Sequence, residues 1–370
     1  MRGVLSKART RLALGSVTAV AALAVGVIAS VAIRASSAGA TPRAQTSPAH
    51  RSAGAARSPL LAWSAPQSID KRALLAIRCP TASFCVAIDS AGNVLTTTSP
   101  LAGAKGWKRS HLDKSLTALA CPSTVLCVAV DSNGYVLTSR KPAGGAKTWS
   151  KKLVDTVLPR ELSAVACRSN LCVTGDNQGN AFTSTNPAGG RHAWKLTSLP
   201  SNGDSPGVMS GFSCPLRSLC VGVDQSTGEG FIDDVFTSTD PTASNKWNLT
   251  TEFTDNSFNA VACPTKSLCV APTDAGEVMT ATDPTHGPSW HATTLVNNVS
   301  INAVACSSVS FCVLGDDSGR VETSTNPTAG AKAWLSQDVA AKDAIESLAC
   351  ASARLCVAVT PKGDAIVGSR

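Results

Sequence analysis

The sequence lacks an excess of either charge over most of its length. Eight of its 33 Lys and Arg residues lie in residues 1–60, which contain no Asp or Glu. Residues 61–370 therefore hold the other 25 basic residues and all 25 acidic ones, so this part is formally neutral. A nucleic-acid-binding protein needs a basic surface that neutralises phosphates. The charge balance therefore predicts that nucleic acid is not a partner.

Residues that bind metals or exchange electrons are also scarce. The chain has five His, all outside the cysteine pairs described below, and no Cys-x-x-Cys sequence. Structural zinc sites need closely spaced Cys and His, and thiol–disulfide enzymes typically use Cys-x-x-Cys. Asp-x-x-Gly turns, at Asp89, Asp131, Asp176 and Asp316, are common in hairpins and lack the ligand density of a calcium loop. We therefore expect no metal and no cofactor.

The N-terminal residues have the pattern of an export segment. Four basic residues precede the uncharged stretch 12–33, which ends at Arg34, and Ala38-Gly39-Ala40 fits a cleavage site. Residues 1–34 are predicted to be either a cleaved signal peptide or an uncleaved membrane anchor. Both alternatives place the rest of the chain outside the cell, secreted or anchored. Residues 35–60, rich in Ala, Ser and Pro, are predicted to be a disordered linker.

Residues 61–370 contain a sevenfold repeat. Cysteines recur as seven pairs, whose first members lie 42 to 49 residues apart, and each of the seven Trp precedes a pair by 14 to 20 residues. The pairs are Cys79/Cys85, Cys121/Cys127, Cys167/Cys172, Cys214/Cys220, Cys263/Cys269, Cys306/Cys312 and Cys350/Cys356. In an exported chain this spacing predicts seven disulfides, each within one repeat.

Each repeat contains four short strand patterns, which we name a to d in chain order. The fifth repeat shows them at Phe258–Cys263, Leu268–Ala271, Glu277–Thr282 and Trp290–Leu295. A period of 40 to 50 residues with four strands per unit is typical of a propeller blade. We therefore predict an all-β, seven-bladed β-propeller over residues 61–370, with one disulfide between strands a and b of each blade.

The loop between strands c and d has a recurrent motif. It runs Ser184-Thr-Asn186-Pro, Ser238-Thr-Asp240-Pro and Ser324-Thr-Asn326-Pro in three copies, each followed by a Trp. It resembles the Asp-box (BNR-type) hairpin of sialidase-like propellers and of those similar to photosystem II assembly factors. The chain departs from that pattern in two copies, where Ser99 and Lys141 occupy the Asp position, and in a longer gap before Trp. The resemblance implies a fold and no catalytic role for the box.

There are seven Trp but six boxes. No box precedes Trp63, and the last strand c, Asp364–Gly368, has no strand d after it. The Trp63 segment is therefore predicted to be strand d of the seventh blade. Such closure would remove two exposed strand edges.

Two groups of residues are candidate binding sites. The first comprises acids in two insertions of the fourth repeat, Asp204, Glu229, Asp233 and Asp234, which we expect to be exposed on loops. The b–c and d–a loops share one face of a propeller, here named the insertion face. The a–b turns and c–d loops share the other, the disulfide face. Loops on a rigid scaffold often carry binding residues.

The second candidate lies near the propeller axis. The position four before the first Cys of each pair is polar in six repeats: Thr117, Ser163, Ser210, Asn259, Asn302 and Glu346, with Leu75 in the seventh. Arg78 stands where most other repeats have Ala. Arg78 and Glu346 are therefore candidate residues for binding a small polar molecule in the channel.

Three functions are compatible with the sequence. The first is a monomeric, non-catalytic recognition or scaffold module for a protein or a cell-surface glycan. The second is a glycoside hydrolase, which the resemblance to sialidases suggests. A sialidase site uses three arginines and a Tyr–Glu pair, whereas the only tyrosine here, Tyr135, lies in an ordinary hairpin. The third is an assembly-factor-like scaffold. The first fits the residues best.

Overall fold

The computed structural model describes residues 60–370 except 159–160, 201–206, 226–231, 244 and 255–256. The expected signal or anchor, residues 1–34, and the linker lie outside the described residues, apart from Leu60. Within the described part no helix is long and apolar enough to cross a membrane.

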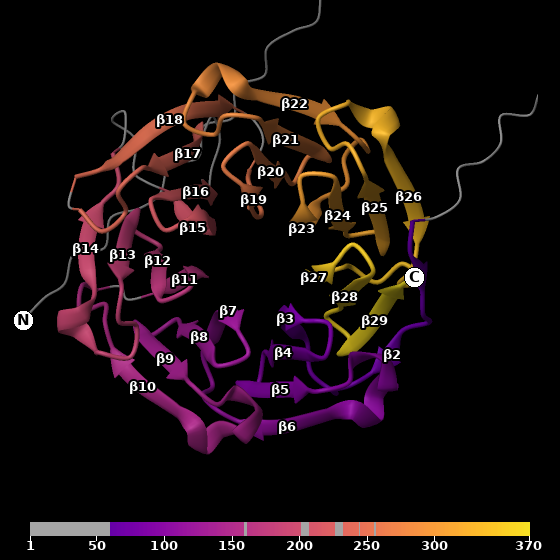
Figure 1. Cartoon of the computed structure of the whole chain (residues 1–370), viewed down its shortest axis with the longest axis horizontal. Helices are drawn as coiled ribbons and strands as arrows, with labels where there is room; N and C mark the ends of the chain where they lie inside the picture. The colour runs from indigo at the N-terminus through magenta and orange to yellow at the C-terminus, as the bar shows by residue number, and fades with distance from the viewer. Residues whose placement is uncertain (1–59, 159–160, 201–206, 226–231, 244, 255–256) are drawn as a thin grey trace, which may run out of the picture. The chain divides into compact units, whose positions relative to one another are not determined.

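Residues 61–370 form seven antiparallel sheets arranged as blades around a central channel (Figure 1). The strands of blades 1 to 3 are β3 (Leu74–Thr81), β4 (Phe84–Asp89), β5 (Asn93–Thr97) and β6 (Trp107–His111); β7 (Leu116–Ser123), β8 (Leu126–Asp131), β9 (Tyr135–Ser139) and β10 (Trp149–Leu153); and β11 (Leu162–Arg168), β12 (Leu171–Asp176), β13 (Asn180–Ser184) and β14 (Lys195–Ser198). This architecture confirms the predicted seven-bladed propeller.

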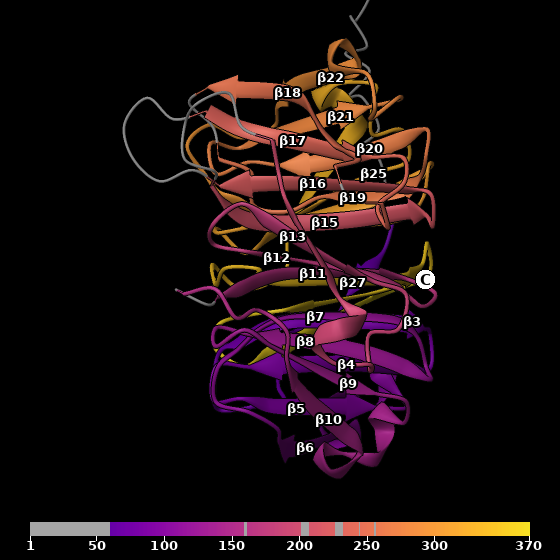
Figure 2. The ribbon, with the colours of Figure 1, turned by 90° about the vertical axis from the view of Figure 1, so that its left-hand side faces the viewer.

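The other four blades follow the same order. Their strands are β15 (Val208–Leu216), β16 (Leu219–Gln225), β17 (Ile232–Ser238) and β18 (Trp247–Thr254); β19 (Ala262–Thr265), β20 (Leu268–Pro272), β21 (Glu277–Ala281) and β22 (Trp290–Thr294); β23 (Ile301–Ser308), β24 (Phe311–Asp316), β25 (Arg320–Ser324) and β26 (Trp334–Asp338); and β27 (Ser347–Ser352), β28 (Leu355–Val359) and β29 (Asp364–Ser369). Figure 2 shows the ring from its side, with the strands of blade 4 stacked one over another.

Burial explains why the four strands differ in composition. Strand b of a blade, such as Leu126–Asp131, is buried at every position because neighbouring blades cover both of its faces. Strand d, such as Trp149–Leu153, exposes its central residues at the rim. Each interface between adjacent blades contains its own apolar cluster, so the core is a ring of seven wedges.

The ring closes as the sequence predicts. Strands β1 (Ala62–Trp63) and β2 (Gln67–Ser68) pair with β29, and Trp63 lies opposite Gly368. A Cβ at Gly368 would lie 2.8 Å from the Trp63 ring, so the indole packs where only glycine leaves room. Strands β1 and β2 together thus form strand d of blade 7.

All seven predicted disulfides are present, each joining strands a and b of one blade. They are Cys79–Cys85, Cys121–Cys127, Cys167–Cys172, Cys214–Cys220, Cys263–Cys269, Cys306–Cys312 and Cys350–Cys356. All 14 cysteines lie in the described part of the chain, and none is free. The predicted pairing is therefore confirmed in every blade.

The two cysteines of a bridge have different surroundings. The second cysteine, on strand b, is 0% exposed in every blade: Cys85, Cys127, Cys172, Cys220, Cys269, Cys312 and Cys356. Each of these packs in an apolar cluster between blades, and none lines a cavity at the channel. The first cysteine, on strand a, borders the channel in six blades: Cys79, Cys121, Cys167, Cys214, Cys306 and Cys350. The strand-b cysteines are thus core residues that a ligand in the channel does not reach, and their role is structural.

The Asp-x-x-Gly turns use their carboxylates locally. Oδ1 of Asp89 accepts hydrogen bonds from the backbone N–H groups of Ala91 and Asn93, at 2.9 and 2.7 Å. Gly92 has φ +80°, and a Cβ there would lie 1.5 Å from the Asp113 carbonyl oxygen, so glycine is required. The other three turns repeat the Oδ1 pattern. These carboxylates stabilise turns, as an Asx-type hydrogen bond does.

The c–d loops are held by similar local bonds. Ser184 Oγ accepts from the N–H of Asn186 at 3.0 Å, and Ser324 Oγ accepts from Asn326 at 3.1 Å. In two loops the indole N–H of the following Trp donates to the carbonyl of the loop proline, Trp194 to Pro187 at 3.4 Å and Trp290 to Pro284 at 3.3 Å. The motif therefore shapes the loop and seats the tryptophan against it.

One core position breaks the repeat. A central position of strand c is apolar in six blades and packs against the preceding blade: Leu95, Leu137, Phe182, Phe236, Met279 and Ile366. In blade 6 it is Glu322, which is 4% exposed. Its Oε1 accepts from Ser336 Oγ at 3.1 Å, and its Oε2 has no hydrogen-bond partner among the described residues. Burial, with a smaller contribution from Asp316, raises the pKa of Glu322 to about 7.

Glu322→Met is expected to stabilise the protein, and more at pH 8 than at pH 4. Because the pKa of Glu322 is raised in the fold, ionisation favours the unfolded chain as the pH rises from 4.5, the ordinary pKa of a Glu, to about 7. Each pKa unit corresponds to about 1.4 kcal/mol, so a gain of about 1–3 kcal/mol is expected at pH 8. Thermal unfolding across this pH range measures it. Glu322→Gln removes only the ionisable group. Its gain in stability over the wild type should therefore increase between pH 4 and pH 8 as that of Glu322→Met does. Equal stability of all three proteins at pH 8 would contradict this.

Candidate functional site

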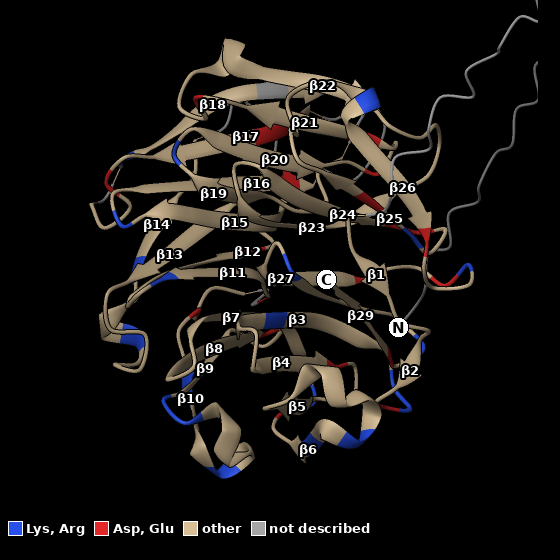
Figure 3. Ribbon diagram, turned by 45° about the vertical axis from the view of Figure 1, so that its right-hand side comes forward, with Lys and Arg blue, Asp and Glu red and all other residues tan. Residues whose placement is uncertain are grey.

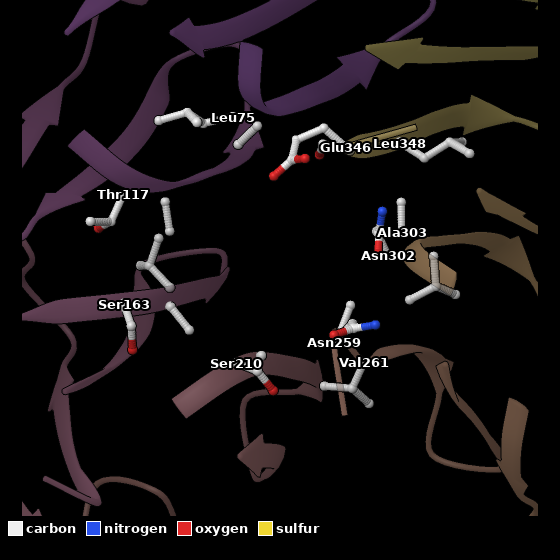
Figure 4. A pocket seen from close by; sticks show the side chains of 18 of the residues that line it. Leu75, Thr117, Ser163, Ser210, Asn259, Val261, Asn302, Ala303, Glu346 and Leu348 are labelled. Carbon is white, nitrogen blue, oxygen red and sulfur yellow. The ribbon is translucent and has the colours of Figure 1, made fainter. Parts of the chain in front are cut away.

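The polar positions near the axis line one cavity. Leu75, Thr117, Ser163, Ser210, Asn259, Asn302 and Glu346, one from each blade, surround a space of about 490 Å³ (Figure 4). Asp317, in the b–c turn of blade 6, also lines it, so this is the channel mouth on the insertion face. The sequence repeat thus identified the positions that surround the axis.

Several of these side chains join adjacent blades. The Thr117 hydroxyl donates to the Leu162 carbonyl at 2.5 Å, and Ser163 donates to the Met209 carbonyl at 2.6 Å. Asn259 Nδ2 similarly donates to the carbonyl of Ile301 at 3.1 Å. Each bond runs from one blade to the next. These side chains therefore stabilise the ring, and their donor capacity is already used.

The polar groups of blades 6 and 7 differ from the rest of the ring. Asn302 Nδ2 donates to Asp317 Oδ1, and Asn302 Oδ1 accepts from Ser300 Oγ at 2.7 Å. Glu346 points its carboxylate into the cavity (Figure 4), where no described residue forms a hydrogen bond or ion pair with it. Burial, followed by the negative charge of Asp317, raises the pKa of Glu346. The mouth therefore has an acidic side formed by two carboxylates.

The other end of the channel is different. A second cavity of about 290 Å³ opens on the disulfide face, lined by residues of the a–b hairpins, among them Arg168. Arg78 lines both cavities, so its side chain lies where they meet. Arg78 and Glu346, both predicted from sequence, thus lie on the same channel.

Two of the four candidate acids of the fourth repeat, Asp233 and Asp234, are not the exposed loop residues that we expected. Asp233 and Asp234 belong to strand β17 and are 2% and 8% exposed. Their strand pairs with β18, where Asp233 lies opposite Phe253. The insertion lengthens the antiparallel pair of β17 and β18, which explains why these acids lie in a strand. Asp204 and Glu229 lie outside the described residues.

The buried acids of blade 4 gather around Asp224, which ends the regular part of strand b. Its Oδ1 accepts from the N–H of Asp234 at 2.7 Å and its Oδ2 from the N–H of Gly207 at 3.1 Å. Burial, with a smaller contribution from the charge of Asp233, raises the pKa of Asp224 to about 6. Asp224 thus joins the starts of strands β15 and β17 and has a structural role.

No group of three or more His, Cys, Asp or Glu in the described ranges is arranged to hold a metal ion. Asp317 is the charged residue in the described lining of the mouth that the sequence analysis missed. It follows the turn residue Asp316 directly, and only the fold shows that its side chain reaches the cavity. An acid next to an Asp-x-x-Gly turn on the insertion face is the available signal.

Comparison with known proteins finds relatives by fold only. No family model and no curated protein matches the sequence. A solved structure described as YCF48 bound to D1 peptide matches with a TM-score of 0.63 and 12% identity, over 85% of this chain and 96% of that one. YCF48 from Cyanidioschyzon merolae matches with a TM-score of 0.61 and 13% identity, over 82% and 98%. At such identities the likeness establishes the propeller fold alone.

Proposed function

We propose that this chain is an exported, non-catalytic recognition or scaffold propeller that binds a protein segment at the channel mouth on the insertion face. The acidic side of the mouth carries the proposal: Glu346 and Asp317 place two carboxylates at a cavity where Thr117, Ser163 and Asn259 already donate to backbone carbonyls. Since one structure of the same fold is described with a bound peptide, a peptide ligand is consistent with this architecture. The c–d loops are proposed to be Asp-box-type hairpins.

The preferred ligand is a basic side chain. A Lys or Arg in the cavity would face Glu346 and Asp317, and a partly desolvated ion pair contributes more than one at an open surface. The polar ring would also offer backbone and hydroxyl contacts. A basic peptide therefore fits the mouth better than an acidic one does.

A glycoside hydrolase fits this cavity poorly. Its described lining contains one arginine, Arg78, and one aromatic residue, Phe212, which is itself 7% exposed. Retaining and inverting hydrolases need two carboxylates that flank the scissile bond. Glu346 and Asp317 instead lie on one side of the mouth, in neighbouring blades. The described lining of this cavity also offers a glycan no exposed aromatic ring for stacking.

The test is binding of short synthetic peptides to the full-length protein, with a glycan array in parallel. We expect peptides rich in Lys or Arg to bind, and the double variant Glu346→Gln/Asp317→Asn to bind them at least about tenfold more weakly. Binding should also weaken at acid pH, because the pKa of Glu346 is raised and protonation removes its charge.

Asp338→Asn serves as the control, because Asp338 is an exposed acid on the outer strand of blade 6. It should bind the same peptides as the wild type does. If the double variant binds them equally well, the site is wrong. If only glycans bind, the protein-recognition function is wrong.

A further inference from the structure

A single arginine lines the channel where its two cavities meet. The residue before the first Cys of each pair is small in six blades: Ala120, Ala166, Ser213, Ala262, Ala305 and Ala349. In blade 1 it is Arg78, whose side chain borders the cavities on both faces. Blade 1 thus has a guanidinium at a position of the channel wall where the other six blades have a small side chain.

The guanidinium of Arg78 has little compensation. Nη1 donates to the Ile77 carbonyl at 2.7 Å, which uses one of the five N–H donors of the guanidinium. Within the described residues no carboxylate lies within ion-pair distance of it. Burial lowers the pKa of Arg78, because desolvation disfavours the charged form. A charge in such surroundings gains from a counter-ion.

The cavity on the disulfide face has the charge that suits an anion. Its described lining contains Arg78 and Arg168 and no Asp or Glu. The remaining lining residues are mostly small or apolar and belong to the a–b hairpins. The carboxylates Glu346 and Asp317 instead line the opposite mouth. The channel is therefore acidic at one end and basic at the other.

We propose that the cavity on the disulfide face binds an oxyanion, a carboxylate or a phosphoryl group, through Arg78, with Arg168 at its rim. A guanidinium presents paired N–H donors that match two oxygens of either group. At about 290 Å³ the cavity admits a small anion or the end of a larger ligand. The site lies at the other end of the channel from the proposed peptide site and does not depend on it.

The experiment is calorimetric titration of the full-length protein with inorganic phosphate and, separately, with acetate, at constant ionic strength. We expect saturable binding of at least one anion. Arg78→Ala should weaken it at least about tenfold, because the substitution removes both the positive charge and the paired N–H donors. Phosphate binding alone would identify phosphoryl ligands, and acetate binding alone would identify carboxylates.

The variants keep the test informative. Arg78→Ala should fold, because five blades already have Ala at this position and one has Ser. Arg354→Ala removes an exposed arginine from the a–b turn of blade 7, outside the cavity lining, and should bind the anion normally. If neither anion binds, or if Arg78→Ala binds as tightly as the wild type, the proposal is wrong. Peptide binding at the opposite mouth is measured separately and tests only the proposed function.

Discussion

Reduction of the disulfides is expected to lower the free energy of unfolding by on the order of 10 kcal/mol. Six bridges join residues six apart in sequence, and one, Cys167–Cys172, joins residues five apart. In the chain-entropy model a loop of this size is worth about 2 kcal/mol, and seven such loops are lost together. Since a typical domain has a stability of about 5–15 kcal/mol, the reduced chain should be close to unfolding.

Thermal unfolding with and without a non-thiol reductant measures this effect, with alkylation and mass spectrometry to count free thiols. The variant Cys350→Ala/Cys356→Ala removes one bridge and should lose only about 2 kcal/mol. A fully reduced protein that melts at the temperature of the oxidised one would contradict the expectation. So would several alkylated cysteines in the native protein.

The repeats made this fold predictable. A disulfide between strands a and b and a tryptophan at the start of strand d recur in all seven repeats, and an Asp at the end of strand b recurs in five, because their surroundings recur from blade to blade. Cys306 and Cys312 are directly opposite in the hairpin, and the same register explains Cys350 and Cys356. Even the closure at Trp63 followed from counting boxes against tryptophans.

Residues that break the repeat were harder to place. Asp233 and Asp234 look like loop acids, because the sequence does not show that the insertion extends a strand pair. Their burial depends on Asp224, whose carboxylate accepts the Asp234 N–H. Glu322 also looks like a surface residue, although its register puts it at the interface of blades 5 and 6. In each case tertiary packing overrides the polarity of the side chain.

Net charge is similarly a poor guide to local charge. Residues 61–370 are formally neutral, yet residues 100–158 contain nine Lys and Arg against three Asp. Figure 3 shows basic segments around blades 1 and 2 and acidic ones on β17 and β25. The prediction that nucleic acid is not a partner rests on the net value. The net charge likewise does not reveal that one end of the channel is acidic and the other basic.

Deletion of residues 61–69 is expected to destabilise the propeller by several kcal/mol and to promote aggregation. It removes β1 and β2, and with them the bonds from the Ser64 N–H to the Val367 carbonyl and from the Ile69 N–H to the Gly363 carbonyl. It also removes Leu61, which is 2% exposed and packs in the cluster shared by blades 6 and 7. Burial of one such side chain contributes about 1.5–3 kcal/mol. The deletion would leave β29 as an open edge, which is a template for pairing with another chain.

The measurement compares melting temperature and light scattering of the deletion variant with those of the wild type. Deletion of residues 35–58 is the matched control, because it leaves every strand of the ring in place. A point variant separates packing from edge exposure: Leu61→Ala should lower the free energy of unfolding by about 2–4 kcal/mol without aggregation. Leu101→Ala, at a residue that is 67% exposed, should change it by less than about 0.5 kcal/mol. If both deletions are tolerated equally, the ring does not depend on this strand for its stability, even though the strand completes blade 7.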